Sequence, residues 1–260
     1  MGILNVTPDS FSDGGKFDTL NGGLTQAAEM INQGADIIDV GGESTRPGAK
    51  PVTVQQELDR TIPVIEALAS RFDTLLSIDT SKALVMTEAV KAGAGLINDV
   101  RALREGNALQ AAAQSGAAVC LMHMQGQPRT MQSNPTYSDV LIDVKQFLSN
   151  RINDCIDAGI PKSKLIVDPG FGFGKTLPHN YQLLGRLAEL HDLSVPLLVG
   201  ISRKSMIGTV LDCDVEHRLP GSLTAATIAL MKGAHILRVH DVKQTVDAVK
   251  IVSALSTYKE

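Results

Sequence analysis

Short apolar runs recur along the chain, and each follows a glycine and ends on a polar residue. Five segments share this order: NQGADIIDVG, KAGAGLINDV, QSGAAVCLMH, DAGI followed by KLIVDPG, and MKGAHILRVH. Glycine takes the left-handed conformation that ends many helices at little cost. Short continuous apolar runs are typical of strands buried on both faces, as in parallel sheets. The pattern predicts helices that end at the glycines and buried strands that follow them.

The pattern predicts a strand at residues 2–5, 36–40, 75–79, 95–98, 117–123, 164–168, 196–200 and 235–240. A helical pattern follows each strand. One helix begins at Thr53 with a capping box to Gln56, and Ser81 is expected to cap another. Regular alternation of strand and helix predicts a parallel α/β fold. Eight such units favour one closed (β/α)₈ TIM barrel over residues 1–260, and an open doubly wound sheet is the alternative.

Length and composition agree with this fold and narrow the function. The chain has 260 residues, and 43% of them are hydrophobic, which is enough for one barrel and its core. The net charge of −4 argues against broad attraction to nucleic acid or to anionic membranes. The three cysteines are far apart and form no CxxC, which indicates reduced thiols and a cytoplasmic protein. The sequence shows no apolar run of membrane-helix length and no signal-peptide layout at its beginning.

Polar residues stand at the ends of nearly all the predicted strands. They are Asn5, Asp39, Asp79, Asn98, His123, Asp168, Ser202 and His240. The simplest explanation is that polar residues merely end strands, but it does not account for so many carboxylates, amides and imidazoles. All strand ends of a barrel meet on one face, where barrel enzymes have their active sites. Such groups are costly to desolvate without partners, so we predict a polar ligand among them.

Three connections after the strands add to this prediction. VTPDSFSDGGKFDTL and GGESTRPGAKPV are long and irregular, as binding loops are, although plain surface loops remain the alternative. DPGFGFGKT resembles a phosphate-binding loop, but Pro169 stands where that motif needs glycine. We interpret its glycines as positions that let the backbone approach a flat ligand.

Basic residues gather after the last two strands, which form the usual anion-binding quarter of a barrel. Arg203 and Lys204 follow the seventh strand, and Arg238 and His240 belong to the eighth. The sequence has no HxH, HExxH or cysteine cluster, which argues against zinc. The oxygen donors Asn5, Asp9 and Asp13 suit magnesium held partly by substrate phosphates.

Together these motifs resemble those of the dihydropteroate synthase family of folate biosynthesis. The matching strings are MGILNVTPDSFSDGG, IIDVGGESTRPGA, SIDTSK, LINDVR, CLMHMQG, DPGFGFGK, LVGISRKSMIG and LRVHD. They span almost the whole chain in the family's order. The resemblance implies the barrel fold and a pterin-binding transferase that joins 6-hydroxymethyl-7,8-dihydropterin diphosphate to p-aminobenzoate, with Mg²⁺ as cofactor. It also implies a homodimer and inhibition by sulfonamides, which compete with p-aminobenzoate.

The resemblance assigns roles to particular residues. The catalytic set is Asn5, Lys204, Arg238 and His240; Asn5 holds the metal and, with Arg238 and His240, the diphosphate. The pterin is bound by Asp79, Asn98, Asp168 and Lys204. The p-aminobenzoate pocket contains Phe11, Thr45, Arg46, Pro47, Phe173 and Ser205.

Two rival functions stay open, and one expectation concerns the barrel floor. A barrel that transfers a methyl group from a folate would share Asp79, Asn98 and Asp168, and a non-catalytic pterin-binding protein would share the pocket without the reaction. For the synthase, we expect a dissociative reaction in which diphosphate leaves before the amine attacks. Family members usually carry a short hairpin under the barrel floor ahead of the first strand. We expect such a segment, if one precedes residue 1, to stabilise the fold.

Overall fold

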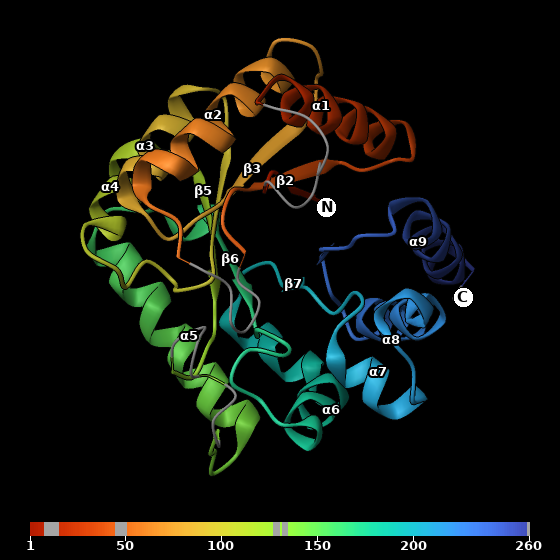
Figure 1. The fold of residues 1–260 in the computed structure, drawn as a ribbon. Coiled ribbons are helices and arrows are strands. Elements are labelled where there is room, and N and C mark those ends of the chain that lie inside the picture. Colours follow the sequence, from red (N-terminus) through yellow and green to blue (C-terminus); the bar gives the residue numbers. More distant parts are fainter. Residues whose placement is uncertain (8–15, 45–50, 127–130, 132–134, 259–260) are drawn as a thin grey trace.

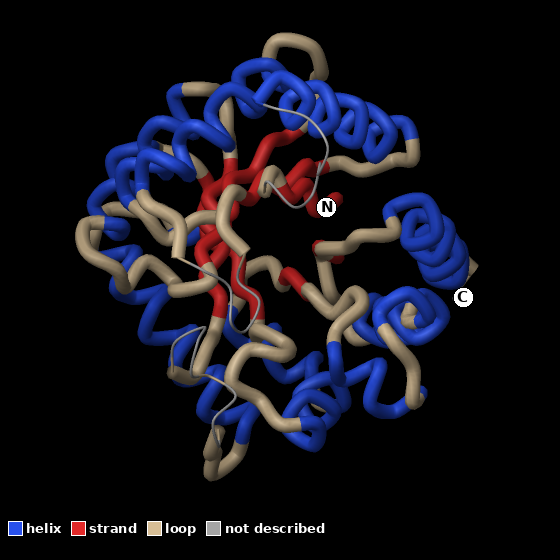
Figure 2. The backbone as a smooth tube through the Cα atoms, viewed as in Figure 1, coloured by secondary structure: helices blue, strands red, loops and turns tan. Residues whose placement is uncertain are grey.

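Parallel strands form a barrel surrounded by helices (Figures 1 and 2). The computed structural model describes residues 1–7, 16–44, 51–126, 131 and 135–258. The strands are β1 (Gly2–Asn5), β2 (Ile37–Gly41), β3 (Leu75–Asp79), β4 (Leu96–Asp99), β5 (Ala118–Met122), β6 (Leu165–Asp168), β7 (Leu198–Val199) and β8 (Ile236–Leu237). Each predicted strand is therefore confirmed, with small shifts at its ends.

Helices lie between the strands in sequence and outside them in space (Figure 2). They are α1 (Lys16–Asn32), α2 (Val54–Ala69), α3 (Ala83–Lys91), α4 (Ala108–Ser115), α5 (Val140–Asp157), α6 (Leu177–Gly185), α7 (Ser205–Leu211), α8 (Leu219–Met231) and α9 (Val242–Thr257). Short 3₁₀ helices occur at Lys162–Lys164, Leu187–Leu193 and Val215–His217. No helix in the described ranges is long and apolar enough to cross a membrane.

Backbone hydrogen bonds close the barrel at both ends of the strand order. Strands β1 to β6 pair in sequence order, and β7 pairs with β8. Val167 of β6 donates its N–H to the Pro196 carbonyl at 3.0 Å, which joins β6 to the chain entering β7. Ile3 of β1 donates to the Val239 carbonyl at 3.0 Å, which joins β8 to β1. The chain therefore forms a closed (β/α)₈ barrel rather than the open doubly wound sheet.

The inside of the barrel changes from apolar to polar along the strands. Leu96, Cys120 and Leu198 pack together inside the barrel and are almost completely buried. Side chains alternate in direction along a strand, so Asn98 points inward above Leu96. The same alternation places Asp168 above Ile166, which contacts this small core. The floor of the barrel is therefore filled, and polar groups are left at the carboxyl ends of the strands.

A larger core lies between the barrel and its helices. It includes Ile38 and Ile78 on the outward faces of β2 and β3 and Leu68 of α2, each with no exposed surface. This layer fixes the helices against the strands and thereby fixes the loops that join strand to helix. Cys155 also belongs to this core, and no disulfide joins it to Cys120 or Cys213.

Local capping confirms one sequence prediction and corrects another. The Thr53 hydroxyl accepts from the Gln56 N–H and the Gln56 side chain accepts from the Thr53 N–H, so the capping box is formed. Ser81, however, does not cap α3, whose N-cap is Lys82 without a side-chain cap. The Ser81 hydroxyl donates to the buried Asp99 carboxylate instead, because that carboxylate needs donors more than the helix end does.

Loss of the capping box should weaken α2 without changing the fold. We expect Thr53→Ala to lower the free energy of unfolding by about 1 kcal/mol, because one N–H of the first turn loses its acceptor. Urea denaturation of both proteins measures this difference. Thr53→Ser keeps the hydroxyl and should stay close to the parent; equal losses in the two variants would contradict the capping role.

Candidate active site

An arginine at the end of β8 joins polar residues from three other strands. The Arg238 Nε donates to Asp39 Oδ2 at 2.6 Å, and its Nη2 donates to Asp79 Oδ2 at 2.7 Å. Asn98 Nδ2 donates to the same oxygen of Asp39 at 3.0 Å. Residues that are far apart in the sequence, Asp39 and Arg238 among them, therefore meet in one hydrogen-bonded group, as the barrel hypothesis required.

The charges in this group do not balance. Asp39 is completely buried and Asp79 is 9% exposed, and one guanidinium serves both carboxylates. Burial, reinforced by the charge of Asp39 and opposed by Arg238, raises the pKa of Asp79 to about 7. Burial alone would lower the pKa of Arg238, but the two aspartates hold it above its usual range. Asp39 Oδ1 has no partner among the described residues, so this cluster has unused capacity to accept hydrogen bonds.

Asp168 and Lys204 form a second charged pair beside the first. A methyl group placed on Gly200 would lie 3.8 Å from Asp168 Oδ2, 3.9 Å from Arg238 Cβ and 4.0 Å from Lys204 Nζ. Burial raises the pKa of Asp168, although the charge of Lys204 opposes this. Burial likewise lowers the pKa of Lys204 to about 8. A side chain at Gly200 would therefore contact both charged groups, and glycine leaves them uncovered on that side.

The connection between β6 and α6 contributes backbone groups to this pair. The Gly170 N–H donates to Asp168 Oδ1 at 2.7 Å, and the Phe171 carbonyl accepts from Lys204 Nζ. The Phe173 ring lies with its centroid 4.7 Å from the same nitrogen. Lys204 is thus held between a carbonyl and an aromatic face.

The glycines of this connection are required by contacts within the protein, whereas the sequence analysis attributed them to the approach of a flat ligand. Gly170 has φ +69°, and a Cβ there would lie 1.9 Å from the His123 carbonyl oxygen. Gly174 has φ +59°, and its Cβ would lie 2.5 Å from the Gln125 carbonyl oxygen. The protein's own backbone after β5 therefore requires both glycines, because left-handed backbone and close approach exclude a side chain.

Two further predicted residues lie at the rim. Asn5 ends β1, and its Oδ1 would lie 3.8 Å from a methyl group on Gly41, the residue that pairs with Asp79 in the next strand. His240 is exposed, and its Nδ1 lies 3.1 Å from the hydroxyl of Ser202. Both side chains are therefore at the carboxyl ends of the strands.

The remaining predicted site residues divide into two groups. Ser205 is exposed at the first position of α7, directly after Lys204. Phe11, Thr45, Arg46 and Pro47 lie outside the described residues.

Arg203 does not join the anion site expected after β7. Its Nε and Nη2 donate to the two oxygens of Asp241, at 2.9 and 2.6 Å. The fixed fork of a guanidinium matches a carboxylate in this way, so the residue serves to tie the β7 and β8 ends together.

The described residues offer few ligands for a metal. No group of three or more His, Cys, Asp or Glu side chains suited to a metal occurs among them. The amide oxygen of Asn5 is a hard donor of the kind that magnesium accepts, and one such donor suits an ion held mainly by substrate phosphates and water. The donor set fits magnesium on those terms only.

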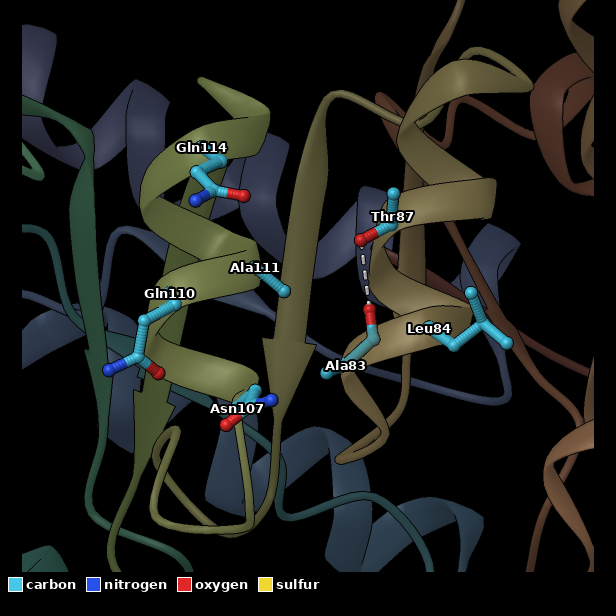
Figure 3. A pocket seen from close by; sticks show the side chains of 7 residues that line it. All are labelled: Ala83, Leu84, Thr87, Asn107, Gln110, Ala111 and Gln114. Carbon is cyan, nitrogen blue, oxygen red and sulfur yellow. Dashed lines mark hydrogen bonds between the residues drawn. The ribbon is translucent and has the colours of Figure 1, made fainter.

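A shallow depression of about 560 Å³ lies elsewhere, between α3 and α4 (Figure 3). Its lining residues are Ala83, Leu84, Thr87, Asn107, Gln110, Ala111 and Gln114. None of them is charged, and the depression lies on the outer helical layer. It does not suit an anionic substrate, so the strand ends remain the candidate site.

Sequence reasoning named Asp39 as a strand end but gave it no role. The structure makes it the residue that joins Arg238 to Asn98. The sequence signal for this role was the alternation of side chains along the strand, because Asp39 lies two residues before Gly41 and faces the same side. In the structure, Gly41 pairs with Asp79. Alternation along β2 therefore places the Asp39 side chain inside the barrel, one layer below.

A closed barrel with carboxylates, an amide and cations converging at its mouth is the arrangement of a barrel enzyme that binds a polar ligand. A family model described as "Pterin binding enzyme" matches residues 1–240. Dihydropteroate synthase of Escherichia coli (strain K12) is 59% identical over 260 residues, which cover 100% of this chain and 92% of that protein. The Haemophilus influenzae enzyme is 57% identical over 254 residues, 98% of this chain and 92% of that protein.

Solved structures agree with this similarity. The Yersinia pestis dihydropteroate synthase in complex with a sulfonamide drug has a TM-score of 0.95 and 59% identity, covering 99% of this chain and 94% of that one. The Xanthomonas albilineans enzyme with 4-aminobenzoic acid has a TM-score of 0.93 and 49% identity, covering 98% and 92%. The chain belongs to the dihydropteroate synthase family, transferases of folate biosynthesis.

The raised pKa of Asp79 predicts a pH-dependent stability. Between pH 3.8, the usual pKa of an aspartate, and about pH 7, the folded protein holds a proton on Asp79 that the unfolded chain releases. This residue therefore contributes a free energy of unfolding that falls as the pH rises through that window. Since Asn cannot ionise, the melting temperature of Asp79→Asn relative to the parent should rise between about pH 5 and about pH 7. A difference independent of pH would show that the Asp79 pKa is not raised.

Proposed function

We propose that this protein joins 6-hydroxymethyl-7,8-dihydropterin diphosphate to p-aminobenzoate, giving 7,8-dihydropteroate and diphosphate. The observation that carries the proposal is the meeting of Asp79, Asn98 and Asp168 with Lys204 and Arg238 at one mouth of the barrel. Family membership supports the same reaction.

The acidic and amide groups match the pterin ring. A 2-amino-4-oxo pterin presents adjacent N–H donors, which a carboxylate such as Asp168 accepts as it would accept a guanidinium. Asn98 uses one Nδ2 hydrogen on Asp39, which fixes its amide and leaves its oxygen and second N–H hydrogen for the ring. Lys204, adjacent to Asp168, donates to a ring acceptor.

The cations match the diphosphate. Arg238 uses Nε and Nη2 on the two aspartates, so with respect to the described residues its Nη1 is left for a phosphate oxygen. His240, at the exposed rim, supplies a second donor and Asn5 holds the metal. Mg²⁺, when bound there, neutralises charge on the departing phosphates. We assign Phe173 and Ser205, together with Phe11, Thr45, Arg46 and Pro47, to p-aminobenzoate, the site where sulfonamides compete.

In the proposed reaction, diphosphate leaves before the amine of p-aminobenzoate attacks. The bond from the exocyclic methylene carbon to the diphosphate oxygen breaks, and its electron pair stays on the oxygen, where the cations stabilise it. The electron-rich ring stabilises the carbon left behind. The amine lone pair of p-aminobenzoate then forms the C–N bond and the nitrogen releases a proton to solvent. A neutral aryl amine is already nucleophilic, so no general base is required. A homodimer and a cytoplasmic location stay predictions from the resemblance and from the cysteines.

One assay tests the function. The protein is mixed with both substrates and Mg²⁺, and dihydropteroate and diphosphate are measured. Equal amounts of the two products are expected. Tight pterin binding without products would identify a non-catalytic binding protein, and methyl transfer from a methylated folate would identify the rival enzyme.

Asp168 should be essential for binding of the pterin ring. We expect Asp168→Ala to weaken binding of 6-hydroxymethylpterin by about 2–5 kcal/mol, the usual cost of losing a buried charged hydrogen-bond partner. Isothermal titration calorimetry measures the affinity. An unchanged affinity would remove Asp168 from the pterin site.

His240 should contribute to binding of the diphosphate group and not to binding of the pterin ring. His240→Ala is expected to weaken binding of the pterin diphosphate by about tenfold or more, since a donor to a charged group is lost. Binding of 6-hydroxymethylpterin without the diphosphate should stay nearly the same. Equal losses for the two ligands would refute this division of roles.

A further inference from the structure

Lys175 is a buried lysine that has no carboxylate partner within the part of the chain that the structure describes. It is 3% exposed, and none of the ion pairs found in the described part of the chain includes it. Its Nζ donates to the Gly170 carbonyl at 2.9 Å and to the Phe173 carbonyl at 3.1 Å, and it lies 2.9 Å from His123 Nδ1. Burial lowers the pKa of Lys175 well below its ordinary value. Burying a lysine in this way costs free energy, so we asked what the contacts of Lys175 contribute to the protein.

Those contacts hydrogen-bond the end of the connection between β6 and α6 (Figure 1) back to its beginning. The side chain of residue 175 reaches back to carbonyls two and five residues earlier. The connection is irregular, because Gly170, Gly172 and Gly174 all have positive φ. Three glycines give the unfolded chain much freedom that folding must remove, so contacts that fix the connection are needed.

The restrained atoms are the ones that support the pterin groups. Gly170, whose carbonyl binds Lys175, donates its N–H to Asp168. Phe173, whose carbonyl also binds Lys175, places its ring beside Lys204 Nζ. Phe171 lies between them in the chain and accepts from Lys204.

We propose that Lys175 is a positioning residue for the transferase reaction: it fixes the β6–α6 connection so that Lys204 is aimed at the pterin ring. This inference rests on the proposed function. It also explains the lysine of the GFGFGK string, which resembles a phosphate loop but bonds to carbonyls of its own chain. Preorganised groups of this kind reduce the ordering that a ligand would otherwise have to impose.

A double-mutant cycle tests the proposal. Lys175→Met keeps an unbranched side chain of nearly the same length and removes its donors. Calorimetry with 6-hydroxymethylpterin should show affinity about tenfold lower in Lys175→Met than in the parent. In the Lys204→Met background, the same change should have a clearly smaller effect, because the part that acts through Lys204 is lost and only the support of Asp168 by Gly170 remains.

The other outcomes are equally informative. An unchanged affinity in Lys175→Met, or a loss of the same size with and without Lys204, overturns the proposal. A parent protein that binds no pterin overturns the proposed function instead. If Lys175→Met does not fold by circular dichroism, Lys175→Gln, which keeps an amide donor, replaces it in the cycle.

Tyr137→Phe is the matched control. The Tyr137 hydroxyl donates to the Gly174 carbonyl of the same connection at 2.6 Å, whereas the Lys175 ammonium donates to the carbonyls of Gly170 and Phe173. Pterin affinity should therefore change by less than about twofold. A loss as large as that in Lys175→Met would mean that any disturbance of the connection matters, and the specific role of Lys175 would be rejected.

Discussion

The salt bridges of Arg238 with Asp39 and Asp79 are the interaction on which the site depends. They join β8 to β2 and β3 across the mouth of the barrel, so they exist only when the barrel is closed. Two buried carboxylates share one guanidinium, and burial, reinforced by the charge of Asp39, raises the pKa of Asp79 although Arg238 opposes this. Removing one partner of such a cluster leaves uncompensated charge in the interior, which is strongly unfavourable. Closure of the fold and polarity of the site are therefore coupled.

The second pair, Asp168 and Lys204, depends less on strands and more on one connection. Backbone groups of Gly170 and Phe171 bind the two side chains, and glycine conformations make those groups available. The site is thus built from a rigid part, the strand ends, and from a glycine-rich part that an internal lysine restrains. A group that is already aimed at its ligand loses little entropy on binding, so both parts favour recognition of a rigid ring.

The sequence predictions that were wrong share a cause. Ser81 was expected to cap α3, and Arg203 was expected to bind anions, because each was considered with its nearest neighbours. The structure places Asp99 next to Ser81 and Asp241 next to Arg203. A buried or half-buried carboxylate competes strongly for donors, and its position is not visible from local sequence.

The sequence by itself determined the eight strands, the capping box at Thr53 and the set of polar strand ends. These features depend on alternation, propensity and turn chemistry, which are local. Only the tertiary structure decided which polar groups meet: that Asp39 bonds both Arg238 and Asn98, and that Lys175 binds carbonyls instead of phosphate. The physical reason is that closure of the barrel sets distances between residues 199 positions apart, such as Asp39 and Arg238, whereas local pattern carries no information on such distances.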